Sequence, residues 1–231
     1  MKQTKRILAV VLALVLALSV AALCGCQVKS DIKGITTGKT TDATAATAAA
    51  NAESATLPST GYKNPYTGSS TTVEITVKDY GKITVALRPD VAPLSVQNFL
   101  NLANEGFYDG LTFHRIIKGF MIQGGDPLGN GTGGSENQIK GEFEANGVAN
   151  SLSHKRGVIS MARSSAMDSA SSQFFIVHQD SPHLDGQYAA FGEVTEGMDV
   201  VDKIATSVKV EDSNGTVLAA NQPVIESVKI V

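Results

Sequence analysis

Cysteine is nearly absent from this chain of 231 residues, since only Cys24 and Cys26 occur and a single residue separates them. That spacing is too short for an ordinary structural bridge, so we exclude a small disulfide-stapled fold and a cluster of metal-binding thiolates. The chain also has no excess of positive charge. It contains 19 Lys and Arg residues and 22 Asp and Glu residues, which gives a formal net charge of -3. Without a basic field to gather phosphates, the sequence disfavours a nucleic-acid partner.

Common catalytic and cofactor signatures are missing as well. The chain has no G-x-S-x-G and no P-loop, and its four histidines lack the spacing of a zinc site: His114, His154, His178 and His183. Gly129, Gly131 and Gly134 do fit G-x-G-x-x-G. No helix with an apolar stripe is predicted after them, which favours a surface loop over a dinucleotide-binding loop. We therefore expect neither a metal nor a cofactor.

The first 25 residues predict a signal peptide for export. Three basic residues precede an uninterrupted apolar run at 7–18, which is shorter than the ~20 residues that a membrane-spanning helix needs. The sequence Leu-Cys-Gly-Cys that ends at Cys26 resembles a bacterial lipobox. We therefore expect cleavage before Cys26, lipid on its thiol, and a location at the cell membrane on the extracytoplasmic face.

Residues 26–70 are rich in Thr, Ala and Ser and contain few large apolar side chains. Such a composition cannot bury enough apolar surface to offset the entropy of folding, so it predicts a flexible tether. A flexible coil of this length would have a root-mean-square reach of about 35 to 40 Å. The folded domain is then expected at 71–231.

Strands dominate the pattern of the folded part. Alternating apolar residues predict a hairpin from 73–78 and 82–87, and an amphipathic helix follows Pro93 and stops at Gly106. A second short helix is expected at 198–205, and the further strands are expected at 112–117, 157–162, 173–178, 190–194 and 223–231. Many short strands with Gly-rich connections and no β-α-β alternation predict an antiparallel barrel or sandwich.

One stretch, from Phe113 to Asp126, combines a cation with apolar and amide side chains. It reads F-H-R-I-I-K-G-F-M-I-Q-G-G-D, so that Arg115 stands close in sequence to an aromatic ring, a thioether and an amide. Gly119 allows a sharp turn there, and the two later glycines allow close approach of the backbone. The stretch is therefore a candidate site in which a cation adjoins an apolar surface.

Together with later motifs, this stretch resembles the cyclophilin family of peptidyl-prolyl cis-trans isomerases. The later motifs follow in order: G-T-G-G at 131–134, S-M-A at 160–162, S-Q-F-F-I at 172–176, L-D-G at 184–186 and F-G-x-V-x-E-G-M at 191–198. The resemblance covers roughly 72–231. It implies a mainly β fold, namely a closed eight-stranded antiparallel barrel capped by two helices, with a substrate groove on its outside.

The resemblance also implies roles for individual residues. Arg115 would be catalytic, since a guanidinium can hydrogen-bond to the amide nitrogen or hold the preceding carbonyl while the Xaa-Pro bond twists. Phe120, Met121, Phe175 and Leu184 would grip the proline ring. The remaining substrate contacts would come from Gln123, Ala162, Arg163, Gln173, His183 and Tyr188. The partners expected are proline-containing polypeptides, and no feature of the sequence predicts an oligomer, so a monomer is expected.

Three positions depart from the pattern of many relatives. His183 stands where many carry Trp, Tyr188 where many carry His, and Arg163 where Asn is frequent. Loss of an indole removes a donor and a large contact area, so we expect weak binding of the cyclic peptide cyclosporin. Arg163 is expected to shift preference toward acidic residues upstream of proline. A second hypothesis remains, in which the domain is a proline-peptide binding module or holdase and turnover is incidental.

Overall fold

The computed structural model describes residues 62–63 and 65–231. The predicted signal peptide, Cys26 and most of the predicted linker lie outside these residues. Among the helices that are described, none combines the length and the apolar character needed to cross a membrane.

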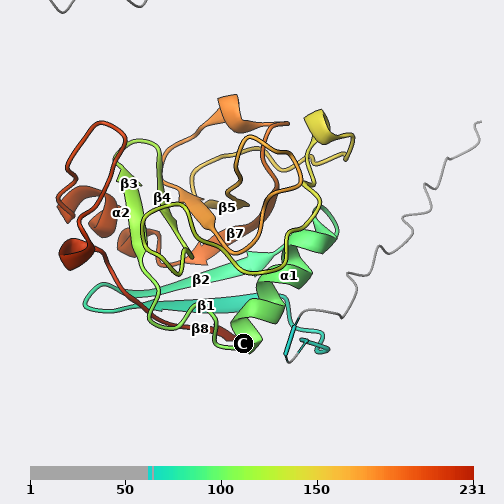
Figure 1. Cartoon of the computed structure of the whole chain (residues 1–231), viewed down its shortest axis with the longest axis horizontal. Coiled ribbons are helices and arrows are strands. Elements are labelled where there is room, and N and C mark those ends of the chain that lie inside the picture. The colour runs from blue at the N-terminus through green and yellow to red at the C-terminus, as the bar shows by residue number, and fades with distance from the viewer. Residues whose placement is uncertain (1–61, 64) are drawn as a thin grey trace, which may run out of the picture. The chain divides into compact units, whose positions relative to one another are not determined.

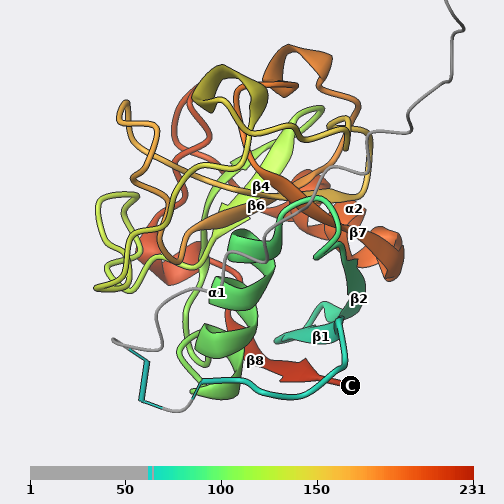
Figure 2. The same cartoon turned by 90° about the vertical axis from the view of Figure 1, so that its right-hand side faces the viewer.

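Eight antiparallel strands form one curled sheet in the order β3-β4-β6-β5-β7-β2-β1-β8, as Figure 1 and Figure 2 show. The strands are β1 Thr72–Val77, β2 Gly81–Leu87, β3 Phe113–Ile117, β4 Met121–Gly124, β5 Val158–Met161, β6 Phe174–Val177, β7 Ala190–Glu196 and β8 Ile225–Ile230. The predicted hairpin is confirmed as β1 and β2, which pair from Thr72 with Ala86 to Val77 with Gly81. Asp79 in its turn takes a positive φ of 64°, a conformation that Asp tolerates better than most residues.

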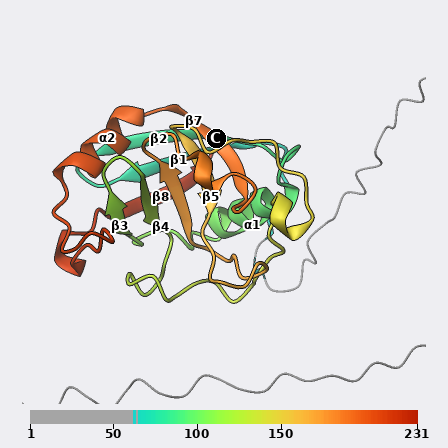
Figure 3. The same cartoon turned by 90° about the horizontal axis from the view of Figure 1, so that it is seen from above.

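Two α-helices lie at opposite ends of the sheet, α1 Pro93–Asn104 and α2 Met198–Ser207 (Figure 1 and Figure 3). Pro93 opens α1, where its missing N–H costs nothing. The carboxylate of Glu142, from a distant loop, accepts hydrogen bonds from the backbone N–H groups of Leu94 and Ser95 at 2.9 and 2.8 Å. A buried anion thus satisfies the first turn of α1 and complements its dipole. Three short 3₁₀ turns, η1 Glu144–Asn146, η2 Pro182–Leu184 and η3 Ala219–Asn221, complete the described elements.

The sheet is a curled, open barrel, and the prediction of a closed one is wrong. Its edge strands β3 and β8 do not pair with each other. The segment 209–224, which contains η3, lies along β3 instead, where the N–H of Ile116 donates to the carbonyl of Gly215 and the N–H of Val217 donates to that of His114. The backbone groups of the β3 edge are therefore satisfied by a loop, which removes the need for a ladder to β8.

The apolar strands in the middle of the sheet are buried on both faces. In β6, Phe174 and Ile176 belong to the main core inside the sheet, whereas Phe175 and Val177 belong to a second cluster on the other face. We call this second group the outer cluster; its buried members are Met121, Val158, Phe175, Val177, Leu184 and Ala190. Burial on both faces explains why the sequence of β6 is continuously apolar and does not alternate.

Candidate active site

Three residues that lie side by side on neighbouring strands form the centre of the site. Arg115 of β3 pairs with Gln123 of β4, and Gln123 pairs with Phe175 of β6. Side chains that stand directly opposite on adjacent strands project from the same face of a sheet. The register therefore places a cation, an amide and an aromatic ring side by side on the outer face.

A β-bulge directs Arg115 to that face. Along β3, Phe113 is paired with Gly124 and Arg115 with Gln123, so His114 is one extra residue in β3. Strict alternation would put Phe113 and Arg115 on the same side, yet Phe113 is fully buried in the main core and Arg115 lies on the outer face, where it lines a cavity. Bulges commonly re-aim a side chain in this way.

Hydrogen bonds hold the Arg115 guanidinium in place. Its Nε donates to the carbonyl of Asn214 at 2.9 Å, its Nη2 to Oδ1 of Asn214 at 3.3 Å, and its Nη1 to Oε1 of Gln123 at 3.2 Å. Arginine has five N–H donors, so two remain for a ligand. Burial lowers the pKa of Arg115, and Tyr188 and Asp212 act in the opposite direction. The guanidinium nevertheless stays charged, because arginine is not deprotonated in proteins.

A chain of side-chain amides fixes the orientation of Gln123. Its Nε2 donates to Oε1 of Gln173 at 2.9 Å, and Nε2 of Gln173 donates to the carbonyls of Gly131 and Gly133 at 3.1 and 2.7 Å. Gln123 can therefore present only its carbonyl oxygen to Arg115. The amide chain makes Gln123 a positioning residue for the cation.

Beside Arg115 the outer face is hollowed into a cavity of about 680 Å³. All but two of the predicted catalytic and substrate-binding residues line it: Arg115, Phe120, Met121, Gln123, Ala162, Arg163, Phe175, Leu184 and Tyr188. The two exceptions are Gln173, which acts through Gln123 and borders a smaller neighbouring cavity, and His183, whose exposed ring packs on Phe120 with centroids 5.4 Å apart. The apolar walls come from the outer cluster and from the turn before β4 that carries Phe120.

Arg163 is immobilised at the border between the two cavities. Its guanidinium carbon lies 4.8 Å from the ring centre of Tyr188 and 5.0 Å from that of Phe143. Its Nε and Nη2 donate to the carbonyl of Gln187 at 3.1 and 3.0 Å. Because Tyr188 in turn meets Phe175 edge to face at 5.9 Å, Arg163 braces one wall of the cavity.

Behind Phe175 lies a buried histidine that the sequence alone did not single out. The ring of His154 stacks on Phe175 at 6.0 Å, its Nδ1 lies 2.8 Å from Oδ1 of Asp185, and its Nε2 lies 3.0 Å from Oγ of Ser160. Burial lowers the pKa of His154 and outweighs the opposing effect of Asp185. A neutral ring that donates from Nδ1 to Asp185 and accepts from Ser160 satisfies every partner.

Asn214 is the second residue that sequence reasoning missed. It holds two of the three nitrogen atoms of the Arg115 guanidinium, although it is 99 positions away in the chain. Asn214-Gly215 is a typical turn dipeptide and could have marked this segment as a tight loop. No local pattern could have indicated that the loop folds back onto β3.

The glycine-rich loop has a structural role that differs from phosphate binding. Oδ1 of Asp126 accepts from the N–H of Leu128, and Oδ2 accepts from the N–H groups of Asn130 and Gly131. Burial alone would raise the pKa of Asp126, but these backbone hydrogen bonds outweigh it and lower the pKa. The N–H groups that a dinucleotide loop would offer to phosphate are thus already used. In the described part of the chain, no three His, Cys, Asp or Glu side chains are grouped so as to hold a metal ion.

Comparisons with known proteins agree with this architecture. Residues 72–231 match the family model described as cyclophilin type peptidyl-prolyl cis-trans isomerase/CLD. Peptidyl-prolyl cis-trans isomerase B of Bacillus subtilis (strain 168) is 51% identical over 123 residues, which cover 53% of this chain and 82% of that protein. Peptidyl-prolyl cis-trans isomerase A of Dickeya dadantii (strain 3937) is 40% identical over 182 residues, covering 76% and 93%.

Solved structures give the same result. A crystal structure of a Cryptosporidium parvum cyclophilin type peptidyl-prolyl cis-trans isomerase, obtained in the presence of the dipeptide Ala-Pro, superposes with a TM-score of 0.61. It is 32% identical and covers 69% of this chain and 98% of that chain. The sequence, the eight-stranded fold and these similarities together show that the chain belongs to the cyclophilin-type peptidyl-prolyl cis-trans isomerase family.

Proposed function

We propose that this chain uses Arg115 to accelerate rotation about Xaa-Pro bonds in exported polypeptides. The family to which the chain belongs is one of peptidyl-prolyl cis-trans isomerases. Relatives that are 40 to 51% identical are named for that activity. The observation that supports a role for Arg115 is its placement, a guanidinium with two uncommitted N–H groups beside a cavity with apolar walls.

The chemistry requires no bond to be cut. Rotation must break amide resonance against a barrier of about 18 to 20 kcal/mol, and as the amide twists, the lone pair localises on the proline nitrogen. A hydrogen bond from Arg115 to that nitrogen would be stronger in the twisted state than in either planar state, which is the condition for catalysis. A hydrogen bond from Arg115 to the carbonyl of the residue before the proline would also favour the twisted state. The donors require no reorientation, because Gln123 and Asn214 already fix them.

Arg115 cannot supply the whole acceleration. A charge-assisted hydrogen bond contributes about 1.5 to 3 kcal/mol, whereas a 10⁵-fold acceleration needs about 7 kcal/mol. The remainder is assigned to the apolar walls of Phe120, Met121, Phe175 and Leu184. They would hold the proline ring still while the segment before it turns, and they would keep water from the twisting amide.

A proline-peptide binding module or holdase is the alternative. Apolar walls alone would suit such a module, but a binder has little need of a cation held in place by three hydrogen bonds. The two functions are separated by two-dimensional exchange NMR of an Ala-Pro peptide with the full chain, purified in detergent. An enzyme present at about one molecule per 1,000 peptide molecules would raise the exchange rate well above its spontaneous value. A binder would broaden or shift the peptide signals only at near-equal concentrations and would leave the exchange rate unchanged.

Export and lipid anchoring are the second part of the proposal. They rest on the basic residues, the apolar run and the lipobox-like sequence before Cys26. The mature protein would be tethered by lipid on Cys26 to the extracytoplasmic face, where it would assist the folding of exported proteins as a monomer. Intact-mass analysis of protein from its native membrane tests this proposal. We expect a chain that begins at Cys26 and carries added acyl mass; an unmodified Cys26 would contradict the anchor and leave the isomerase proposal standing.

A further inference from the structure

We propose that the cavity continues past Arg115 into a second substrate subsite, which binds an aliphatic side chain of a residue flanking the proline. The inference rests on the proposed isomerase function, since the ligand is the same polypeptide. It concerns the part of the cavity away from the outer cluster. We call this part the leucine subsite; its residues are His114, Leu128, Leu218 and Gln222.

The two leucines of this subsite are unusually exposed. Leu128 is 66% and Leu218 is 52% exposed, and both line the cavity that contains Arg115. Single exposed apolar side chains are common and need no explanation. Here, however, two exposed leucines from segments 90 positions apart line the same cavity. An aliphatic group placed between them would remove apolar surface of both from water.

Gln222 fixes the two leucine-bearing segments relative to each other. Its Nε2 donates to the carbonyl of Gly129 at 2.8 Å and to the carbonyl of Val217 at 2.9 Å. Gly129 follows Leu128 directly, and Val217 directly precedes Leu218. Its Oε1 is in turn bound by the hydroxyl of Thr112. The spacing of the walls is therefore set before a ligand arrives, which lowers the entropic cost of binding.

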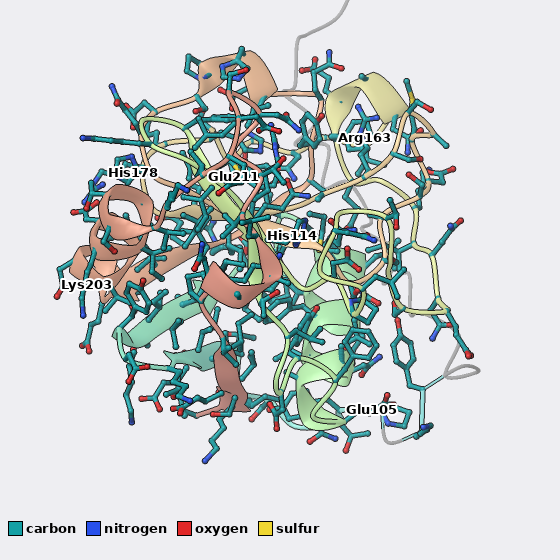
Figure 4. All side chains as sticks on the ribbon, turned by 60° about the vertical axis from the view of Figure 1, so that its left-hand side comes forward. Glu105, His114, Arg163, His178, Lys203 and Glu211 are labelled. Atoms are coloured by element: carbon teal, nitrogen blue, oxygen red, sulfur yellow. The ribbon has the colours of Figure 1, made fainter. Side chains whose placement is uncertain are left out.

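His114 borders this part of the cavity as an unsatisfied polar group. This bulged residue of β3 is only 5% exposed, and neither ring nitrogen has a hydrogen-bond partner. Its Nε2 faces Gly131, where an added Cβ would lie 3.7 Å away. Figure 4 shows His114 near the middle of its view and Arg163 toward the upper right. Nearly all buried polar groups in proteins are paired, and protein atoms cover both imidazole nitrogens here, so a ligand group would pair with His114 by displacing the atoms that cover it.

The chemistry of the subsite selects its occupant. Burial lowers the pKa of His114, and a neutral imidazole offers one donor and one acceptor, as a peptide group does. The oxygens of the nearby Asp126 carboxylate already accept hydrogen bonds from the backbone N–H groups of Leu128, Asn130 and Gly131, so they are not directed at a ligand side chain. An aliphatic side chain between the leucines, with its own peptide group at His114, fits both features.

The test compares peptides that differ only in where one leucine stands. The full chain is assayed by exchange NMR on an alanine-rich peptide with a single proline, and one alanine at a time is replaced by leucine on either side of the proline. We expect leucine at one position to lower KM about 3- to 10-fold. The Leu128→Ser/Leu218→Ser double variant should lose that gain, and the control Val231→Ser, also at an exposed side chain, should keep it. Equal KM values for all peptides with the wild-type chain would overturn the leucine subsite, whereas no turnover of any peptide would overturn the isomerase function itself.

A separate variant tests the imidazole. His114→Leu removes both unpaired nitrogens, so the melting temperature should stay the same or rise. The KM for the preferred leucine peptide should nevertheless increase about 3-fold or more, because the peptide group loses its partner. An unchanged KM together with a lower melting temperature would show that His114 serves the fold and does not contact substrate.

Discussion

The two apolar clusters differ in what covers them, although they are built from the same strands. The main core is enclosed on every side and is filled with rings such as Phe99, Tyr108 and Phe174, which meet at centroid distances of 4.9 to 5.6 Å. In the outer cluster, by contrast, Met121, Phe175 and Leu184 line the cavity next to Arg115, and Leu184 comes from the short turn η2. One face of the sheet therefore supplies stability, and the other retains apolar surface for a ligand.

The largest effect is expected from the inward-facing ring of β6. Phe174→Ala should lower the free energy of unfolding by about 3 to 5 kcal/mol, because it removes a fully buried ring that packs edge to face on Phe99. Urea denaturation followed by circular dichroism measures this change. A loss below about 1 kcal/mol would show that the main core is not the principal source of stability.

Substitution of the adjacent outward-facing ring should affect activity more than stability. Phe175→Leu keeps an apolar side chain at the cavity wall, so we expect it to cost less than about 1.5 kcal/mol of stability. It removes the flat surface next to Tyr188 and His154, and we expect kcat/KM for an Xaa-Pro peptide to fall about 10-fold or more. A large loss of stability with an unchanged rate would erase the distinction between the two faces.

The contrast also shows what the sequence could reveal. The hairpin, both helices and most strands could be predicted because each is set by local periodicity, and Arg115, Phe120 and Phe175 stand within recognisable motifs. The short strand β4 was not predicted, since Met121–Gly124 offers four residues and two glycines follow one another at its end. Asn214 and His154 act across 99 and 31 positions, and only the folded chain shows those contacts.

A third, smaller effect concerns the support behind Phe175. The pKa of His154 is lowered by burial below its ordinary 6.5, so the unfolded chain binds the proton more readily than the folded chain. Its contribution to stability is therefore complete above about pH 6.5 and is lost as pH falls toward the folded pKa. His114, whose pKa burial also lowers, adds a loss of the same sign.

The variant His154→Gln should cost about 1 to 3 kcal/mol at pH 7.5, because the buried hydroxyl of Ser160 loses its acceptor and the carboxylate of Asp185 keeps only the backbone N–H of residue 154 of its two donors from that residue. It should also reduce the fall in stability between pH 7.5 and 5.5. The exposed His183→Gln serves as the control and should leave the wild-type slope in place. Identical pH slopes in all three proteins would exclude His154 as a source of the dependence.

The smallest effect is expected at Arg163. Its guanidinium is partly exposed, and its donors already bind the carbonyls of Gln187 and Ser164. An acidic residue upstream of proline should gain at most about 1 kcal/mol, or about 5-fold in kcat/KM, and salt should remove the gain. A Glu-to-Lys peptide series at low and high ionic strength measures the preference; identical rates at low salt would remove Arg163 as a determinant of specificity.

The central claim is that the Arg115 guanidinium acts on the twisted amide and contributes little to holding the planar one. It is tested most directly by measuring exchange rate and peptide affinity in the same NMR samples for Arg115→Ala and the wild-type chain, with Arg115→Lys as a variant that keeps the charge but loses the planar donors. For Arg115→Ala we predict a loss of about 10- to 100-fold in kcat with affinity changed by less than about 3-fold. Exchange at the wild-type rate in Arg115→Ala would contradict the account.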